Sequence, residues 1–252
     1  MTDSRTLSYI NLRAILGTLP LLCELVPEAR ELIKGKQIRI GFSVKSGPSG
    51  RLCFDGESCR WEEGADPCHL KLSFSSPEKF NRMVDGAFTP IPWKGLTRVS
   101  FLLKTFMPLT DLLSRYLRPT QEDLEDETFY GISTQLMFHV IAEAVAAIAN
   151  EDAVGKASAS YIVDGAARLM IGGEDRSYTL VARDHRLSVS EGDSVPMTSY
   201  MRFEDLRTAR ELFDGKINAV AAVGEGRVRV GGMISQMDNI NRILDRVALY
   251  LA

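Results

Sequence analysis

The side chains that most often carry chemistry are few in this chain and are not spaced as a catalytic motif. The histidines are His69, His139 and His185. His139 lies beside the apolar face of a predicted helix, where a histidine is usually a packing residue. His185 follows Arg183-Asp184 in a predicted turn, and the segment Ser46 to Gly50 lacks the Gly-x-Ser-x-Gly elbow of hydrolases. We therefore predict that the chain is not an enzyme.

The four cysteines do not predict a metal site. Cys23, Cys53, Cys59 and Cys68 all lie in the first third of the chain. Zinc sites usually hold cysteine pairs two to four residues apart, and these spacings are wider. The glycine-rich segment 215–232 also lacks the lysine pattern of a phosphate loop. We expect reduced, buried thiols, no metal and no cofactor.

Charge and hydropathy restrict the classes of partner that the chain is expected to bind. The formal net charge is -3 and no Lys/Arg run is present, so the chain is a poor candidate for nucleic acid and for constitutive electrostatic attachment to anionic lipid. Nowhere do about 18 uncharged apolar residues run together, so no membrane span is expected. Asp3, Arg5 and Arg13 break the order of a signal peptide. These observations predict a cytoplasmic protein.

The first half is predicted to contain a helical segment, four strands, a helix, a fifth strand and a further helix. Residues 37–45 alternate apolar and polar side chains, which is typical of a strand with one buried face. Ser76-Pro77-Glu78 combines a cap, a proline and an acid at the start of a helix. Further strands are expected at 51–54, 59–61, 69–74 and 97–105, and a helix at 106–117.

The second half repeats this order after a polar, acidic segment at 118–127, the expected linker. Apolar residues at three- and four-residue steps from Phe129 to Ile148 predict a long helix. We therefore expect two domains, 1–120 and 121–252. Strands are expected at 157–163, 167–171, 177–182, 187–190, 198–203 and 227–230, and helices at 204–213 and 236–251.

Residue matches between the halves predict an internal duplication. Asp85-Gly86 matches Asp214-Gly215. At the same offset, Gly95 matches Gly224 and Arg98-Val99 matches Arg227-Val228. Leu72 and Phe74 also match Met201 and Phe203.

The second half carries a longer pattern. Gly215-Lys216-Ile217-Asn218 is followed by Ala222 and then by Gly226-Arg227-Val228-Arg229-Val230-Gly231-Gly232-Met233. This pattern resembles the C-terminal signature of the sterol carrier protein type-two lipid-binding family, although Met233 follows Gly232 directly where the family has one residue between them. The first half departs from the pattern, with Gly86-Ala87-Phe88-Thr89 and Leu102-Leu103-Lys104 at the two ends.

The resemblance implies an α+β fold. Each half would be a sterol-carrier-protein-like unit, a mostly antiparallel, about five-stranded sheet covered by helices, with an apolar cavity between the layers. Members of the family bind sterols, fatty acyl chains or other lipids without catalytic residues. Methionine and aromatic side chains suit adaptable ligand surfaces, although each could equally serve the core. The candidate ligand-binding residues are Phe42, Phe74, Trp93, Phe101, Met137, Met170, Met201, Val220, Val223 and Met233.

The expected function is binding and carriage of a lipid or fatty-acid-like ligand, with transient membrane or enzyme partners. The closing helix is the expected gate, through Ile234, Met237 and Ile240. Replacing Met233 or Met201 with Asp should abolish fatty-acid binding while the fold survives. One alternative is a scaffold that presents a lipid-like biosynthetic intermediate, such as a polyprenyl quinone precursor, to partner enzymes. A second alternative is a subunit of an enzyme.

Overall fold

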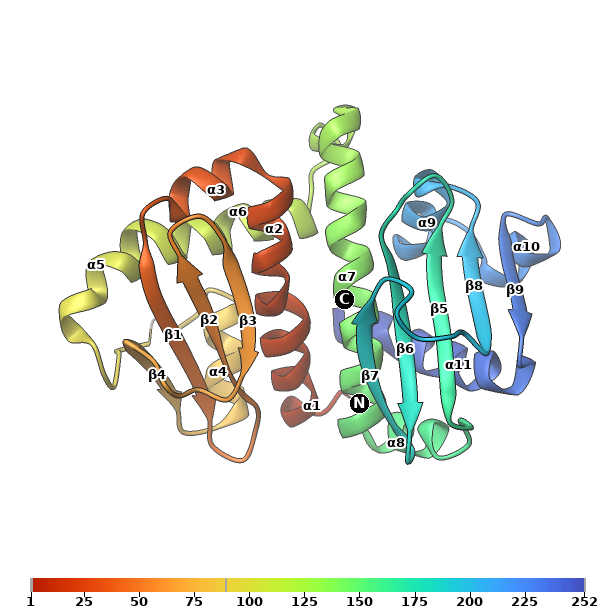
Figure 1. The fold of residues 1–252 in the computed structure, drawn as a ribbon, viewed down its shortest axis with the longest axis horizontal. Coiled ribbons are helices and arrows are strands. Elements are labelled where there is room, and N and C mark those ends of the chain that lie inside the picture. Colours follow the sequence, from red (N-terminus) through yellow and green to blue (C-terminus); the bar gives the residue numbers. More distant parts are fainter. Residues whose placement is uncertain (1, 89, 252) are drawn as a thin grey trace. The chain divides into compact units, whose positions relative to one another are not determined.

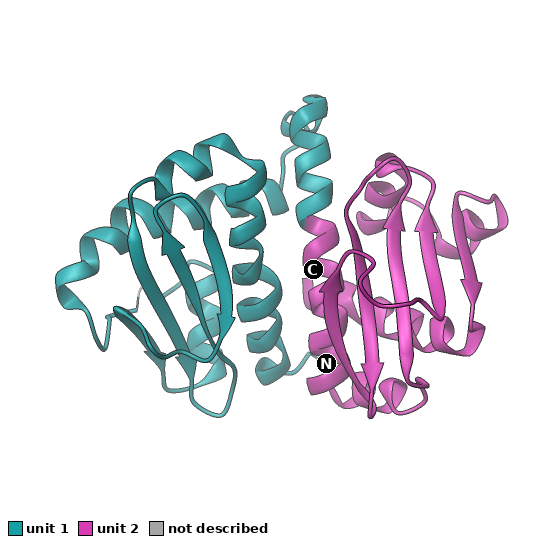
Figure 2. Cartoon of the chain, in the orientation of Figure 1, with its two compact units in different colours: residues 1–136 teal, residues 137–252 magenta. Residues whose placement is uncertain are grey.

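The computed structural model describes residues 2–88 and 90–251. It forms two compact units, unit 1 (Met1–Leu136) and unit 2 (Met137–Ala252), shown in Figure 2. The division falls within helix α7 (Glu127–Glu151), later than the boundary expected at residues 120 and 121. Thr89, which belongs to the first half's departure from the signature, lies outside the described residues.

Unit 1 contains a four-stranded sheet in the order β3-β2-β1-β4. Strands β1 and β4 are parallel, and the other neighbours are antiparallel. Phe42 is paired with Leu72, and Val44 with Phe74, so that buried apolar side chains share one face of the sheet. The strands are β1 (Gln37–Val44), β2 (Ser49–Asp55), β3 (Cys59–Glu63) and β4 (Leu70–Phe74).

Helices supply the rest of the core of unit 1, and Figure 1 shows α4 and α6 behind its sheet. Pro27 and Pro77 each occupy the first turn of their helix, where the missing N–H costs nothing. The helical segments are α1 (Ser4–Tyr9), a π-helix (Ile10–Ile15), a 3-10 helix (Leu16–Thr18), α2 (Leu19–Leu25), α3 (Pro27–Ile33), α4 (Pro77–Val84), a 3-10 helix (Leu96–Arg98), α5 (Val99–Phe101), a π-helix (Leu102–Phe106), α6 (Met107–Leu117) and a 3-10 helix (Asp123–Glu125).

The strand expected at residues 97–105 is wrong, because this segment is helical. Leu102, Phe106 and Leu109 are buried at four- and three-residue spacing, and this helical period continues into α6. The local alternation around Val99 and Phe101 is therefore overridden by a longer helical pattern. As a result, unit 1 has four strands where about five were expected.

Unit 2 contains a five-stranded sheet in the order β7-β6-β5-β8-β9, in which only β5 and β8 are parallel. Figure 1 shows α9 and α11 behind this sheet. The α+β class and the mostly antiparallel pairing agree with the sequence prediction. The remaining elements are β5 (Gly165–Ile171), β6 (Ser177–Arg183), β7 (Arg186–Glu191), β8 (Ser199–Phe203), β9 (Val228–Gly232), α8 (Ala153–Ala159), α9 (Leu206–Phe213), α10 (Ala219–Gly224) and α11 (Ile234–Leu251).

A second expected strand, at residues 157–163, is also wrong. The segment lies in helix α8 and the turn after it. Asp152 caps this helix by accepting hydrogen bonds from the N–H groups of Val154 and Gly155, at 2.9 and 2.8 Å. An aspartate in this position is a helix-start signal, and the small residues that follow it pack closely in the interior.

Two helical stretches, Ser4–Leu25 and Glu127–Glu151, are long and apolar enough to cross a membrane by length and composition alone. In each, 72% of the apolar window is buried inside the structure. Leu12 and Leu19 in the first stretch and Val145 in the second are completely buried. Burial of this extent is typical of the core helices of a folded domain.

Candidate functional site

The cysteines pack in the interior. All four are buried and free, and within the described ranges no group of three His, Cys, Asp or Glu side chains could hold a metal ion. Burial raises the pKa of Cys53, Cys59 and Cys68 above the ordinary value of a thiol. A hydrogen bond with Cys59 lowers the pKa of Cys23. Three of the four thiols are therefore kept neutral, which disfavours nucleophilic chemistry.

The three histidines lie in separate parts of the fold, in a loop, a helix and a turn. The Nδ1 atom of His69 accepts a hydrogen bond from the backbone N–H of Arg39 at 3.0 Å. The Nδ1 atom of His139 lies 3.2 Å from the hydroxyl oxygen of Tyr178. His185 has a φ of 60° in the turn between β6 and β7. The three side chains thus lie in different elements.

In unit 1, three of the four candidate ligand-binding residues lie in or against the packed core. Phe42 and Phe74 are buried, and the Phe101 ring lies 5.4 Å from the ring of Phe54. Phe42 and Phe106 have ring centroids 5.8 Å apart. Trp93 differs, because 83% of its surface is exposed. Trp93 is therefore part of the surface of unit 1.

In unit 2, much of the space between helix and sheet is filled by aromatic rings. The Phe138 ring contacts the rings of Tyr178, Phe203 and Phe213 at 4.9, 6.3 and 6.1 Å. The neighbouring candidate Met137 is half-buried on α7. The expected apolar cavity between the layers is therefore occupied by side chains around Phe138.

The two candidate methionines on the sheet of unit 2 face opposite sides. Met201 is buried and is paired with Val230. Met170 is half-buried and alternates with buried Leu169 and Ile171, so that it lies on the outer face. Because Met201 is a core residue, an aspartate there would bury a charge, and we now expect Met201→Asp to destabilise unit 2 as well as any ligand site.

The remaining three candidates lie in the signature segment, Val220 and Val223 before β9 and Met233 after it. Met233 is half-buried between β9 and α11, and its N–H donates to the carbonyl oxygen of Thr198 at 3.1 Å. Val220 and Val223 lie on α10, where they are exposed, Val220 by 81%. These two valines form an apolar rim at the surface, whereas the exposed Ile234 lies at the other end of β9, at the start of α11.

Helix α10 was not predicted from the sequence. Its signal is Asn218, whose side chain caps the helix by accepting from the N–H of Ala221 at 3.1 Å. Ala222 is buried, whereas Val220 and Val223 point outward. A helix this short gains its stability from packing against its neighbours, and α10 packs next to β9.

A pocket of about 150 Å³ begins directly after α10. The two residues of the turn from α10 to β9, Gly226 and Arg227, contribute to its wall. The side chains that line the pocket carry three guanidinium groups and one carboxylate. They are Arg202, Glu204, Arg227 and Arg229.

Arg202 and Arg229 are directly opposite each other across the β8–β9 pair. Like charges in this arrangement destabilise a sheet, and in the described part of the chain neither guanidinium has an ion-pair partner. Arg227 is different, since its Nη2 atom lies 2.6 Å from a carboxylate oxygen of Glu211, and this hydrogen bond raises its pKa. The pocket is therefore suited to an anionic group placed between Arg202 and Arg229.

The pocket was not predicted from the sequence, and it contains none of the ten candidate residues. The signal was present in the alternation of β8 and β9. Met201 and Val230 face inward, whereas Arg202 and Arg229 face the opposite side. The apolar rim and the arginines meet at Gly226-Arg227, the turn from α10 to β9. The pocket can accept a small acidic group, with the exposed apolar side chains of α10 next to it along the chain.

No family model matches the chain, and no curated protein matches it significantly. Among solved structures, the chain is similar to the "UbiJ-SCP2 Ubiquinone synthesis protein", with 16% identity and a TM-score of 0.36 over 46% of this chain and 93% of that chain. It is also similar to Sterol Carrier Protein 2 from Yarrowia lipolytica in its apo form, with 19% identity and a TM-score of 0.33 over 42% of this chain and 88% of that chain.

A third similar structure is the sec-alkylsulfatase Pisa1 from Pseudomonas sp., with 12% identity and a TM-score of 0.26. This likeness covers 57% of our chain and 28% of that enzyme. The names of the first two structures include sterol carrier protein 2 or its abbreviation, SCP2, and the segment 213–233 resembles the signature of that family. These likenesses assign neither a ligand nor an activity to this chain.

Proposed function

We propose that unit 2 binds a hydrophobic ligand with an acidic end group, and that the chain carries this ligand without transforming it. The observation that carries the proposal is the direct junction of an exposed apolar helix, α10, with an arginine-lined pocket. The signature resemblance of residues 213–233 supports the same class of ligand. A fatty acid is the simplest molecule with this chemistry.

The energetics favour binding. Covering exposed apolar surface gains about 25 cal/mol per Å², or about 0.8 kcal/mol per methylene of the ligand. A chain of about sixteen carbons would gain roughly 12 kcal/mol if it were completely covered, before the cost of ordering is subtracted. An anion between Arg202 and Arg229 would also remove their mutual repulsion. These contributions favour an acidic lipid over its neutral alcohol.

The structure changes the expectation about the gate. Ile234 is exposed, but Met237 and Ile240 are buried and hold α11 to the core. The first turn of α11 is also fixed by Gln236. Its Oε1 atom accepts hydrogen bonds from the hydroxyls of Thr198 and Ser199 at 2.8 and 2.5 Å, and its Nε2 atom donates to the carbonyl oxygen of Val163 at 3.1 Å. We therefore propose that α10, rather than α11, moves to admit the ligand.

The test is a titration of the full chain with palmitic acid and with hexadecanol. We expect tighter binding of the acid and a loss of at least about tenfold in affinity for Val220→Asp/Val223→Asp, since charges replace the apolar rim. Arg202→Met should remove the preference for the acid. Both valines are exposed, so that the fold should persist, which circular dichroism would check.

A matched control is Val154→Asp/Val163→Asp, which places two charges at other exposed valines of unit 2. Unchanged palmitate affinity in Val220→Asp/Val223→Asp, or equal losses in both double variants, would contradict the proposal. The scaffold alternative, in which the same site presents a biosynthetic intermediate to enzymes, stays a prediction, as does the cytoplasmic location.

A further inference from the structure

Unit 1 presents a concentration of exposed apolar side chains in a single stretch of 20 residues, from 88 to 107. Ile91 and Trp93 are 82% and 83% exposed, so that their side chains pack against little of the protein. We call this set the 88–107 surface. Its apolar members are Phe88, Ile91, Trp93, Leu96, Leu103 and Met107.

The backbone holds this surface in place. The N–H of Trp93 donates to the carbonyl oxygen of Lys71 at 2.8 Å, and the N–H of Lys71 donates to the carbonyl oxygen of Lys94 at 3.1 Å. These two bonds fix the segment against the edge strand β4. In the helical run that follows, Leu102 and Phe106 point into the core, whereas Leu103 and Met107 are exposed. The surface is thus the outer side of an ordered segment.

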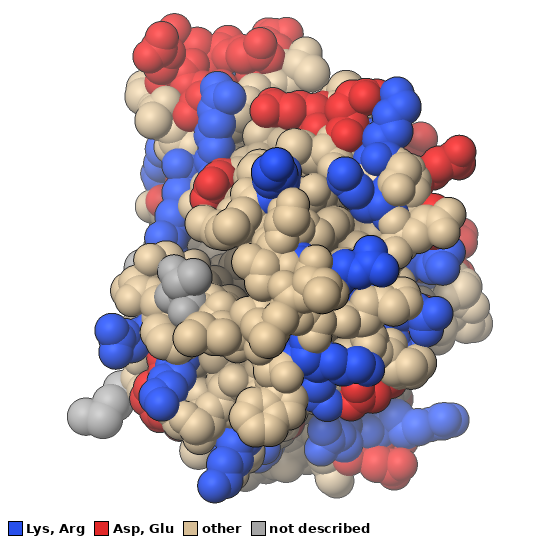
Figure 3. All heavy atoms as spheres, turned by 90° about the vertical axis from the view of Figure 1, so that its left-hand side faces the viewer, with Lys and Arg blue, Asp and Glu red and all other residues tan. Residues whose placement is uncertain are grey.

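The charges within the surface have one sign. Between residues 86 and 110 the sequence contains Lys94, Arg98 and Lys104, and no Asp or Glu. All three cations are exposed, although the chain as a whole has a net charge of -3. The nearest acids along the sequence are Asp85 and Asp111, which flank the stretch. Figure 3 shows this side of unit 1, where Lys and Arg surround a broad uncharged area, most acids gather at the upper end, and a few lie at the lower edge.

We propose that the 88–107 surface docks unit 1 on an anionic lipid bilayer. A tryptophan, aliphatic side chains and interspersed Lys/Arg, with no acid in the segment itself, match the apolar boundary and the negative head groups of such a membrane. Asp66, which is paired with Lys71, also lies near Lys94. The core of a protein–protein interface is depleted in lysine, whereas Lys94 and Lys104 lie among the apolar residues here. The inference does not depend on the ligand proposed for unit 2.

The test is flotation of the full chain with vesicles of phosphatidylcholine, with and without phosphatidylserine. We expect binding to the vesicles that contain phosphatidylserine. Ile91→Ser/Trp93→Ser should weaken this binding at least about tenfold, since two large apolar side chains are lost. Arg98→Ser/Lys104→Ser should weaken it about fivefold for each charge, and this dependence should disappear in high salt.

The matched control is Tyr161→Ser/Val163→Ser, which removes an aromatic and an aliphatic side chain from an equally spaced exposed pair in unit 2. It should bind vesicles as the native chain does. Tryptophan fluorescence adds a local readout, because the chain has only Trp61 and Trp93. A blue shift on vesicles should be absent in Trp93→Phe, since Trp61 is half-buried against Gly50.

Three results would overturn the proposal. They are no binding to either vesicle, equal binding by the Ile91→Ser/Trp93→Ser variant and its control, and a dimer in light scattering that this variant alone dissociates while vesicles are not bound. The last result would assign the surface to a second copy of the chain. Palmitate affinity of the Ile91→Ser/Trp93→Ser variant should be unchanged, so that failure of docking is distinguishable from failure of the ligand site.

Discussion

The two units share a sheet plan and then diverge after its fourth strand. The orders β3-β2-β1-β4 and β7-β6-β5-β8 are the same, and in both the last two strands are parallel. Unit 2 adds β9 beside β8, whereas unit 1 adds a single antiparallel bridge, between Lys71 and Lys94, beside β4. The two units therefore differ in one segment, which connects α4 in unit 1, or α9 in unit 2, to the edge of the sheet.

Two glycines show which residues correspond. A Cβ on Gly95 would lie 2.4 Å from the carbonyl oxygen of His69, and one on Gly232 would lie 2.3 Å from that of Thr198. Both glycines have φ near 80°, and each is followed within two residues by a helical turn. The sequence comparison paired Gly95 with Gly224, but the structure places Gly95 in the position of Gly232. The duplication itself stays a prediction.

This correspondence shows where the two units differ in structure. The longer path in unit 2 contains α10 and the strand that brings Arg229 opposite Arg202. The shorter path in unit 1 forms neither, and its apolar residues remain at the surface around Trp93. From the same sheet plan, one edge thus carries the proposed ligand site and the other the proposed docking surface.

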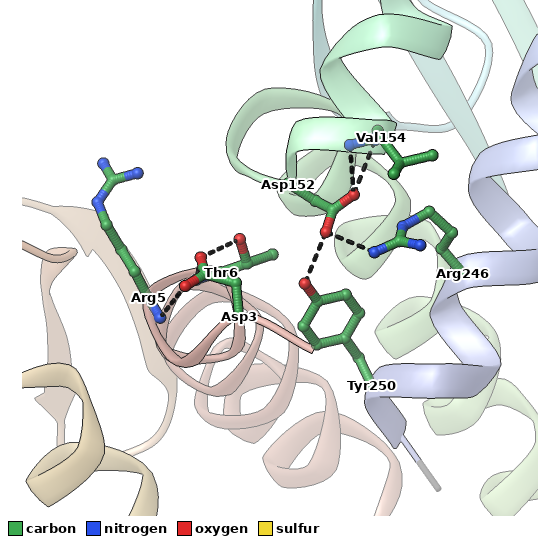
Figure 4. A network of polar contacts seen from close by, with 8 residues as sticks. Asp3, Arg5, Thr6, Asp152, Val154, Arg246 and Tyr250 are labelled. Atoms are coloured by element: carbon green, nitrogen blue, oxygen red, sulfur yellow. Dashed lines mark hydrogen bonds and ion pairs between the residues drawn. The ribbon is translucent and has the colours of Figure 1, made fainter. Parts of the chain in front are cut away.

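The largest expected effect is the loss of Asp152, which holds α8 to α11 in unit 2. Its carboxylate is 4% exposed and accepts hydrogen bonds from Arg246 and Tyr250, each at 2.7 Å (Figure 4). Asp152→Ala should lower the free energy of unfolding by about 3 kcal/mol, because it leaves a partly buried guanidinium unpaired. Urea denaturation measures this loss, and hydrogen exchange should place it in α8 and α11.

Asp3 is the matched control in unit 1. It caps α1 through the N–H groups of Arg5 and Thr6, but it is exposed and at the end of the chain (Figure 4). Asp3→Ala should cost only about 1 kcal/mol, as for an ordinary helix cap. If both variants lose the same amount, Asp152 is a cap and not the centre of a network.

A smaller effect is expected at the two corresponding glycines. Gly95→Ala and Gly232→Ala each put a Cβ at positive φ against a backbone carbonyl, which should cost about 2 kcal/mol in urea denaturation. The controls are Gly86→Ala and Gly173→Ala, which also have positive φ but no atom within 4 Å of the new Cβ. Larger losses at Gly95 and Gly232 than at the controls support the correspondence, whereas equal losses reject it.

The two variants should also separate the two functions. Gly232→Ala disturbs the β8–β9 pair and should weaken palmitate binding, while vesicle binding persists. Gly95→Ala should do the reverse, because it displaces Lys94 and Trp93 from the edge of β4. Loss of both activities in either variant would contradict the division of roles between the two units.

The smallest expected effect is a pH dependence of unit 2. Burial alone would raise the pKa of Asp152, but hydrogen bonds from Arg246, Gly155 and Tyr250 together hold it below the ordinary value of 3.8. A lowered pKa in the folded state means that the carboxylate stabilises unit 2 above this value and that the stability is lost as pH falls through the folded pKa. Thermal melts of native chain and Asp152→Asn should therefore converge below pH 3.8 and separate above it.

Much of the fold could be predicted from local patterns. Alternation located β1, β4, β6 and β8, and the apolar three- and four-residue steps located α7, because these periods follow from backbone geometry alone. The segment 97–105 was wrongly predicted as a strand, because its alternation is short. Its buried side chains follow the helical period that continues into α6. The candidate site was predicted least well, because the arginines of β8 and β9 that line the pocket were overlooked.

Most element types and the α+β class followed from the sequence alone, since these depend on periodicity, caps and composition within a few residues. The tertiary structure alone decided that Arg202 lies opposite Arg229, that α10 presents its valines outward, and that Ile91 and Trp93 of unit 1 stay exposed. These features depend on strand pairing between distant segments, and pairing register is set by the whole sheet rather than by any one of its strands.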